Sequence, residues 1–205
     1  MSNTDNILQL PLMEEFYTIQ GEGAYTGYPA YFIRLGGCDV GCVWCDVKDS
    51  WDADAHPKVA IETIAKAAQA SGAKIAVITG GEPLMYNLTE LTEAIKAKGL
   101  RTHIETSGAH PVTGNWDWIC FSPKKFKAPL EDIYPVADEL KVVVFNKSDF
   151  AWAEKFAELV KPGCRLLLQP EWDKQNEMLP LIIDYVKDKP KWQISLQTHK
   201  FMQIP

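Results

Sequence analysis

Short apolar runs alternate along the chain with amphipathic segments of helical period. Runs rich in β-branched and aromatic residues predict strands over 30–36, 74–79, 101–106, 116–121, 139–145, 165–169 and 192–197. Apolar residues at helical spacing predict helices over 59–71, 88–98, 148–160 and 178–186. Strands that alternate with helices indicate a mostly parallel sheet.

The number of these units sets the architecture. Six or seven strand–helix units in 205 residues are too few for a closed eightfold barrel. We therefore expect an α/β fold, a reduced partial (β/α) barrel that stays open. We expect one domain over 1–205, with 1–12 as a flexible N-terminal lead.

Polar and glycine-rich segments follow the predicted strands. They are Cys38–Cys45, Thr79–Pro83, Glu105–Gly108, Ser122–Lys124, Gln169–Trp172 and Gln197–Lys200. In parallel α/β folds, ligands bind at the carboxyl ends of the strands. These segments are therefore expected to meet at one rim.

Composition narrows the class of protein. Apolar residues make up 46% of the chain and charged residues 23%, as in a soluble globular domain. No apolar run is long enough to span a bilayer, and 1–9 lacks the features of a secretory signal. Five cysteines, three of them clustered, fit a reducing cytoplasm, with Cys120 and Cys164 as inert buried thiols. The net charge of −6 argues against a nucleic-acid surface, although the lysines within 124–127 can bind an anion.

Three cysteines, Cys38, Cys42 and Cys45, form a C-x3-C-x2-C pattern with no fourth cysteine close by. Three thiolates can hold three irons of a 4Fe–4S cluster and leave the fourth iron open, whereas electron-transfer clusters normally have four cysteine ligands. Structural zinc is the alternative, but it normally takes four Cys or His ligands, and the nearest histidine is His56. The spacing therefore favours chemistry at the iron.

Two glycine-rich segments each allow two interpretations. Gly80–Pro83 is either a turn that ends a strand or a place where a ligand approaches the backbone closely. Its position after a strand, alongside the cysteine triplet, favours the functional interpretation. Gln20–Gly23 is either an ordinary turn or part of a binding loop.

Single residues are weaker signals. Glu105 and His199 each end an apolar strand. Each is either a ligand contact or a hydrogen-bonded core residue. Arg34, inside an apolar strand, needs an anionic partner because its charge cannot be removed by titration. A substrate carboxylate and a structural glutamate both qualify. Trp44 is either a core residue or a stacking face for a ring.

Together these motifs resemble the radical S-adenosylmethionine (SAM) superfamily, through the cysteine triplet and Gly80–Pro83. The likeness narrows to the 7-carboxy-7-deazaguanine synthase family, and it extends from about residue 13 to the end of the sequence. The segments that carry it are 16–23, 34–38, 45–46, 105–108, 122–124, 168–170 and 197–200.

The resemblance implies a partial α/β barrel that forms a homodimer and receives electrons from an external donor such as flavodoxin. It implies conversion of 6-carboxy-5,6,7,8-tetrahydropterin to 7-carboxy-7-deazaguanine and ammonia, on the route to queuosine.

It also implies residue roles. Cys38, Cys42 and Cys45 would bind the 4Fe–4S cluster. The SAM site would comprise Trp44, Cys45, Asp46, Gly81, Glu105, Ser107, Ser122, Pro123, Lys124, Gln169, Pro170, Glu171 and Trp172. The substrate site would comprise Ile19, Gln20, Gly21, Glu22, Arg34, Thr79, His199 and Pro205.

The chain departs from the family pattern at Val47, where the family usually has a Thr or Ser that ligates Mg²⁺. A valine side chain has no oxygen, and Mg²⁺ demands oxygen ligands. Three alternatives remain: the metal is held mainly by substrate and water, Asp46 or Ser50 helps, or the metal is not needed.

Two other functions share part of the pattern. A radical SAM activase of a glycyl-radical enzyme has the same cysteine spacing, but it needs a protein partner and gives no reason for Arg34 or the tail around His199. A non-enzymatic metal-binding module leaves the polar strand ends unexplained. Turnover of the pterin separates the first from the synthase, and iron content separates the second.

Overall fold

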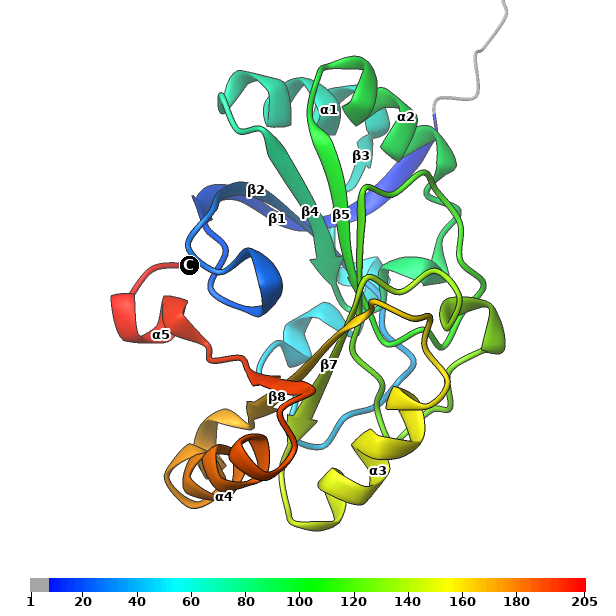
Figure 1. Cartoon of the computed structure of the whole chain (residues 1–205). Helices are drawn as coiled ribbons and strands as arrows, with labels where there is room; N and C mark the ends of the chain where they lie inside the picture. Colours follow the sequence, from blue (N-terminus) through cyan, green and yellow to red (C-terminus); the bar gives the residue numbers. More distant parts are fainter. Residues whose placement is uncertain (1–7) are drawn as a thin grey trace, which may run out of the picture.

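The computed structural model describes residues 8–205 and consists of one curved sheet with helices on its outer face (Figure 1). The strands are β1 (Gln9–Ile19), β2 (Pro29–Leu35), β3 (Lys58–Ala60), β4 (Ile75–Gly80), β5 (Arg101–Thr106), β6 (Trp118–Phe121), β7 (Glu139–Val144), β8 (Arg165–Pro170) and β9 (Trp192–Ile194). The helices are α1 (Ile61–Ala70), α2 (Thr89–Ala97), α3 (Ser148–Ala157), α4 (Gln175–Asp188) and α5 (Thr198–Met202).

The sheet is mostly parallel and does not close. Its order is β3-β1-β2-β4-β5-β6-β7-β8-β9, and every neighbouring pair from β2 to β9 is parallel. Only β1 and β3 introduce antiparallel pairs, β1 with β2 and with β3. The predicted partial α/β barrel is confirmed.

Side chains alternate across each strand, and β7 shows what this does to the molecule. Leu140, Val142 and Val144 are fully buried in the main core, together with Ala153 of α3. The alternate residues Glu139, Lys141 and Val143 point to the inner face of the curved sheet. The outer face is therefore an apolar layer under the helices, and the inner face carries polar groups.

The predicted strands and helices are present, with shifted bounds and some additions. Gln9–Ile19 was not predicted as a strand, because its central Glu14 and Glu15 interrupt the apolar pattern. Within the expected flexible lead, Gln9–Pro11 pair with β3 and Leu10 is buried; residues 1–7 lie outside the described part. The start of the predicted helix 59–71 belongs partly to β3 instead.

The C-terminal part of the chain also differs. The predicted strand 192–197 is shorter, with β9 ending at Ile194, and the short helix α5 follows it. Between β5 and β6 the chain forms no helix, as the sequence predicted. In residues 8–205 no helix has the length and apolar character needed to cross a membrane.

Candidate active site

A cavity lies on the inner face of the sheet at the carboxyl ends of the parallel strands. Its wall is formed by residues of β1, β2, β4, β5, β7 and β8, by the loops after β1, β2, β4, β5, β6 and β8, and by the segment after β9. All the predicted site residues line this cavity except Pro123, which is buried between two residues that do. The polar segments that the sequence placed at the strand ends therefore meet at one rim.

The clustered cysteines lie in the loop that follows β2. Cys38 N donates a hydrogen bond to Trp51 O over 3.1 Å, and Cys45 N donates to Cys42 O over 3.1 Å. Cys42 is buried beside Ala109 in a small apolar cluster, and Cys38 and Cys45 pack against it. The loop is therefore folded back on itself, with its three thiols at the cavity.

The Gly-Gly turn after β4 packs directly on the cysteine loop. Gly81 N donates to Leu35 O and Glu82 N to Gly37 O, both over 2.9 Å. A Cβ on Gly81 would clash with the Gly37 carbonyl group. Because its N–H is occupied, Gly81 can offer only its carbonyl oxygen to a ligand.

Glu82 is buried and joins the ends of β4 and β5. Its carboxylate accepts hydrogen bonds from Leu84 N (3.1 Å), Thr106 Oγ1 (2.5 Å), Ser107 N (2.8 Å) and the Ser107 hydroxyl. The hydroxyl of Ser107, a predicted cofactor contact, is thus already used as a donor and can only accept from a ligand.

The Gln20–Gly23 loop rests on two distant parts of the chain. A Cβ on Gly21 would clash with the ring of His199, and one on Gly23 would clash with the carboxylate of Glu139. Gly23 also has a φ of +69°, which favours glycine. Glu139 Oε2 accepts from Ala24 N over 2.9 Å. The glycines allow this close approach, so the segment is not an ordinary turn.

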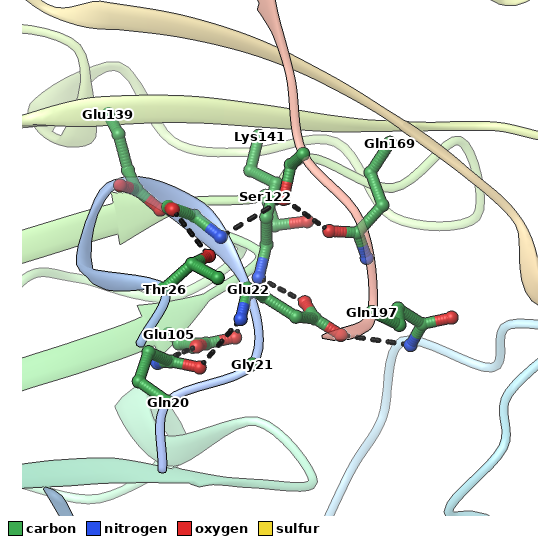
Figure 2. Close-up of polar contacts among 12 residues, drawn as sticks. Gln20, Gly21, Glu22, Thr26, Glu105, Ser122, Glu139, Lys141, Gln169 and Gln197 are labelled. Atoms are coloured by element: carbon green, nitrogen blue, oxygen red, sulfur yellow. Dashed lines mark hydrogen bonds and ion pairs between the residues drawn. The ribbon is translucent and has the colours of Figure 1, made fainter. Parts of the chain in front are cut away.

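Lys141 is itself buried and lies at the centre of a polar network beneath this loop (Figure 2). Its Nζ is 2.5 Å from Glu22 Oε2 and 2.9 Å from Glu105 Oε2. The other oxygens of the two carboxylates accept from Gln197 Nε2 (2.9 Å, Glu22) and Gln20 Nε2 (3.0 Å, Glu105). All five residues line the cavity.

These interactions hold Glu22 and Lys141 in their charged forms. Burial alone would raise the pKa of Glu22, but the Lys141 ammonium and the hydrogen bonds from Lys141 and Gln197 lower it to about 2. Burial alone would lower the pKa of Lys141, but the Cys120 thiol and the nearby carboxylates raise it well above its ordinary value. Glu22 is therefore ionised at neutral pH.

The C-terminal segment forms one side of the cavity. Thr198 N and Oγ1 both donate to Gly21 O over 2.9 Å. Lys200 Nζ is 2.9 Å from Asp46 Oδ2 in the cysteine loop and 4.9 Å from the ring centroid of Trp172. The segment thus joins the N-terminal loop, the cysteine loop and the loop after β8.

The end of the chain returns to β1 (Figure 1). Thr18 Oγ1 donates to Pro205 O over 3.4 Å, and both Pro205 and His199 line the cavity. Burial lowers the pKa of His199, so its ring is neutral at pH 7.

Arg34 on β2 pairs with a glutamate of the fold, Glu14, which is one of the two kinds of partner that the sequence allowed. Its Nε is 2.7 Å from Glu14 Oε1, although without hydrogen-bond alignment, and its guanidinium lies 6.0 Å from the centroid of Phe16. The Glu14 side chain is 46% exposed, so this pair is weakened by solvent. Arg34 also lines the cavity, next to Thr79 in the β2–β4 register, and it can still bind an anion there.

Some predicted cofactor contacts already have partners in the fold. Lys124 Nζ donates to Ser122 O and Oγ, both over 2.6 Å, and lies 6.0 Å from the ring centroid of Trp44. Glu171 accepts from Lys174 N over 3.1 Å and caps the short helix that starts the next turn. These side chains are oriented without a ligand.

Comparison with known proteins agrees with this geometry. Residues 32–120 match the radical SAM superfamily. The 7-carboxy-7-deazaguanine synthase of Flavobacterium psychrophilum is 58% identical over 196 residues, which cover 96% of this chain and 93% of that protein. The chain belongs to the 7-carboxy-7-deazaguanine synthase family. The synthase of Synechocystis sp. is 47% identical over 194 residues, which cover 95% of this chain and 93% of that protein. The crystal structure of QueE from Escherichia coli matches with a TM-score of 0.82 at 31% identity, over 92% of this chain and 93% of that one.

Membership of this radical SAM family implies a 4Fe–4S cluster and SAM, and the cysteine loop fits them. All five cysteines are free. In residues 8–205 no three His, Cys, Asp or Glu side chains converge on one metal ion, as zinc would require. In a cubane each iron takes its own thiolate, so three thiols need not converge. Burial raises the pKa of the Cys42 thiol to about 11, and iron would displace this proton.

The Val47 side chain cannot supply the oxygen ligand for Mg²⁺ that the resemblance predicts at this position. Val47 lines the cavity without a side-chain oxygen. The Ser50 hydroxyl is buried and donates to Val47 O over 2.6 Å, and Asp46 is paired with Lys200. Both helpers considered from the sequence therefore have a partner in the fold, while the Ser50 oxygen keeps its lone pairs and Asp46 Oδ1 is not part of the pair with Lys200.

Several residues of the cavity wall were not singled out from the sequence. They are Phe32, Trp51, Lys141 and Val143. Other wall residues belong to segments that the sequence singled out without giving them a ligand role: Phe16, Val40, Ser50, Gly80, Glu82, Thr106 and Gln197. One signal was available: Glu139 and Lys141 are charged residues two apart in an otherwise apolar strand, so both face the same side of the sheet. Buried charges at such positions need partners. In the structure Lys141 pairs with Glu22 and Glu105, and Glu139 accepts from Ala24 N.

Proposed function

We propose that this protein converts 6-carboxy-5,6,7,8-tetrahydropterin to 7-carboxy-7-deazaguanine and ammonia, as a radical SAM lyase of queuosine biosynthesis. One observation carries the proposal: the cysteine loop, the predicted SAM residues and the predicted substrate residues line the same cavity. A glycyl-radical activase would need this cavity to admit a protein segment. The wall formed by the C-terminal segment favours a small molecule instead.

The cofactors would occupy the side of the cavity nearest the cysteine loop. Cys38, Cys42 and Cys45 would hold the cluster, and the Gly81 carbonyl oxygen would accept from the SAM amino group. SAM, when bound at the open iron, supplies the one-electron chemistry that removes a hydrogen atom from the substrate. The remaining predicted SAM residues, which include Ser122 and Lys124, would orient the cofactor.

The substrate would occupy the side nearest the N-terminal loop and the tail. Arg34 would pair with the substrate carboxylate by charge-assisted hydrogen bonds, because its competing partner Glu14 is open to solvent. Glu22 would accept hydrogen bonds from the pterin ring, together with Gln20 and the neutral ring of His199. Pro205 would contribute a further substrate contact. A wall on this side would also exclude solvent from the reacting atoms.

We also propose the wider context that the family resemblance implies. The protein would be a homodimer that receives electrons from an external donor such as flavodoxin. The free cysteines support a reducing, cytoplasmic location. For Mg²⁺ we propose that substrate and water supply its ligands, because Val47 cannot.

Anaerobic reconstitution tests the proposed function. Protein with iron and sulfide restored, SAM and a reductant is expected to form the deazapurine from the tetrahydropterin, detected by mass spectrometry. Cys42→Ser should abolish product, whereas the matched control Cys164→Ser, which changes a thiol outside the cavity, should retain it. Iron-loaded protein that cleaves SAM but leaves the pterin unchanged would point to an activase.

A further inference from the structure

We infer that Lys141 is a positioning residue that holds Glu22 ionised and in one orientation at the substrate side of the cavity. Glu105 anchors the lysine from its other side (Figure 2). This inference rests on the proposed function, in which Glu22 belongs to the substrate site.

The contact joins a residue of a core strand, Lys141, to a residue of a loop, Glu22. Lys141 lies on β7, whose neighbouring residues Leu140 and Val142 are fully buried in the core. Glu22 lies in the N-terminal loop, 119 positions away in the sequence. The Lys141 side chain is 3% exposed and contacts Glu22 at 2.5 Å and Glu105 at 2.9 Å. A loop carboxylate is thus fixed by a side chain from a strand, which is how a binding group is held accurately.

The charge balance makes this contact more than packing. Glu22 and Glu105 are two carboxylates around one ammonium group, and among residues 8–205 no other cation forms an ion pair with either of them. The other titratable or charged groups that face the pair are Glu139, Cys120, Lys124 and His199. Without Lys141, the two carboxylates would be half-buried like charges in one site, and one of them would take up a proton.

The position of Glu22 also decides the shape of the loop. Glu22 Oε1 accepts from Gln197 Nε2, and the neighbouring Gly21 O accepts from Thr198. Loss of the Lys141 contact would therefore release a loop residue that is also bonded to the C-terminal segment. Substrate binding should suffer more than the fold, because β7 and its core face are unchanged.

Steady-state kinetics of the reconstituted enzyme across pH test the inference. Wild-type protein holds Glu22 ionised throughout the neutral range. In Lys141→Met, two adjacent half-buried carboxylates share no cation, which raises the pKa of one of them, so kcat/KM should rise with pH across the neutral range. At pH 7 we expect kcat/KM to fall about 100-fold, mainly through KM, as for a misplaced binding group. Lys141→Arg, which keeps the charge, should restore most of the loss.

A matched control and a charge-balanced variant guard against misfolding. Lys161→Met also removes a lysine from an ion pair, with Asp138 at 2.7 Å, but outside the cavity, and should keep wild-type KM. Glu22→Gln combined with Lys141→Met removes one charge of each sign. If Lys141 acts through Glu22, this double variant should match Glu22→Gln alone within about threefold, since coupled residues are not additive.

The outcomes separate the two proposals. If the wild type is active and Lys141→Met has the same KM and pH profile, the inference is overturned and the proposed function stands. The inference is also overturned if the loss of kcat/KM in the double variant equals the product of the losses in the two single variants. Wild-type protein that turns over no tetrahydropterin overturns the proposed function, and the inference with it.

Discussion

The backbone of Gly81 rests on the carbonyl group of Gly37, with no space between them for a side chain. This contact joins the turn after β4 to the start of the cysteine loop. It is reinforced by the hydrogen bond from Glu82 N to Gly37 O. The position of the three thiols relative to the turn is therefore set by backbone packing.

Gly81→Ala should displace the cysteine loop. The added methyl group must move backbone rather than a flexible side chain, which typically costs about 1–3 kcal/mol. We expect lower iron retention and weaker SAM binding, measured by iron content and calorimetry. The control is Gly72→Ala, which has strained φ (+77°) but meets no atom within 4 Å. Equal SAM binding in both variants would contradict this account.

A single extra glycine after Pro205 should impair substrate binding. The terminus lies at the cavity beside Thr18, while the preceding segment is tied to the core by Thr198 and Lys200. The added residue cannot relax away without breaking these contacts, so KM for the pterin should rise. An equal extension at the N-terminus should leave KM unchanged, because Gln9, at the start of β1, pairs with β3 and does not line the cavity. Similar KM values for the two extended proteins would exclude a substrate role for Pro205.

Val47→Thr should strengthen any stimulation by Mg²⁺. Threonine has nearly the shape of valine and adds a hydroxyl oxygen at position 47, where the wild-type side chain has none. The measurement is kcat/KM with and without added Mg²⁺, and Val47→Ala serves as the control because it changes volume without adding an oxygen. A metal response identical in the threonine variant and wild type would mean that position 47 is not a ligand.

Glu154 should contribute to stability at neutral pH and lose that contribution in acid. It joins α3 to α4 and β9 through Tyr185 OH (2.6 Å) and Trp192 Nε1 (3.1 Å), and it pairs with Lys191 (2.5 Å). Burial alone would raise the pKa of Glu154, but these partners lower it to about 2, below the ordinary 4.5. A lowered folded-state pKa means that the stabilisation is complete above pH 4.5 and fades as the pH falls towards 2.

Urea denaturation of wild type and Glu154→Gln at several pH values measures this effect. At pH 7 the variant should be less stable by about 1 kcal/mol, after allowance for screening by solvent. The difference should shrink below pH 4.5. A difference independent of pH would assign the effect to packing rather than charge.

The sequence by itself determined the local features of this protein. Strand and helix periods, such as the apolar alternation in β7, depend on neighbouring residues and identified the parallel α/β fold. The spacing of Cys38, Cys42 and Cys45 and the polar strand ends likewise placed the candidate site at one rim, because parallel strands share that edge.

Only the tertiary structure decided which distant groups meet. The ion pair of Lys141 with Glu22 spans 119 positions, and the hydrogen bond of Thr198 to Gly21 spans 177. No local periodicity encodes such pairs, because they arise from the curvature of the sheet and the return of the chain end to β1. Long-range packing also decided the partner of Arg34, the contact of Asp46 with Lys200 and the pairing of β1. In each case it selects one arrangement among several that the local sequence allows.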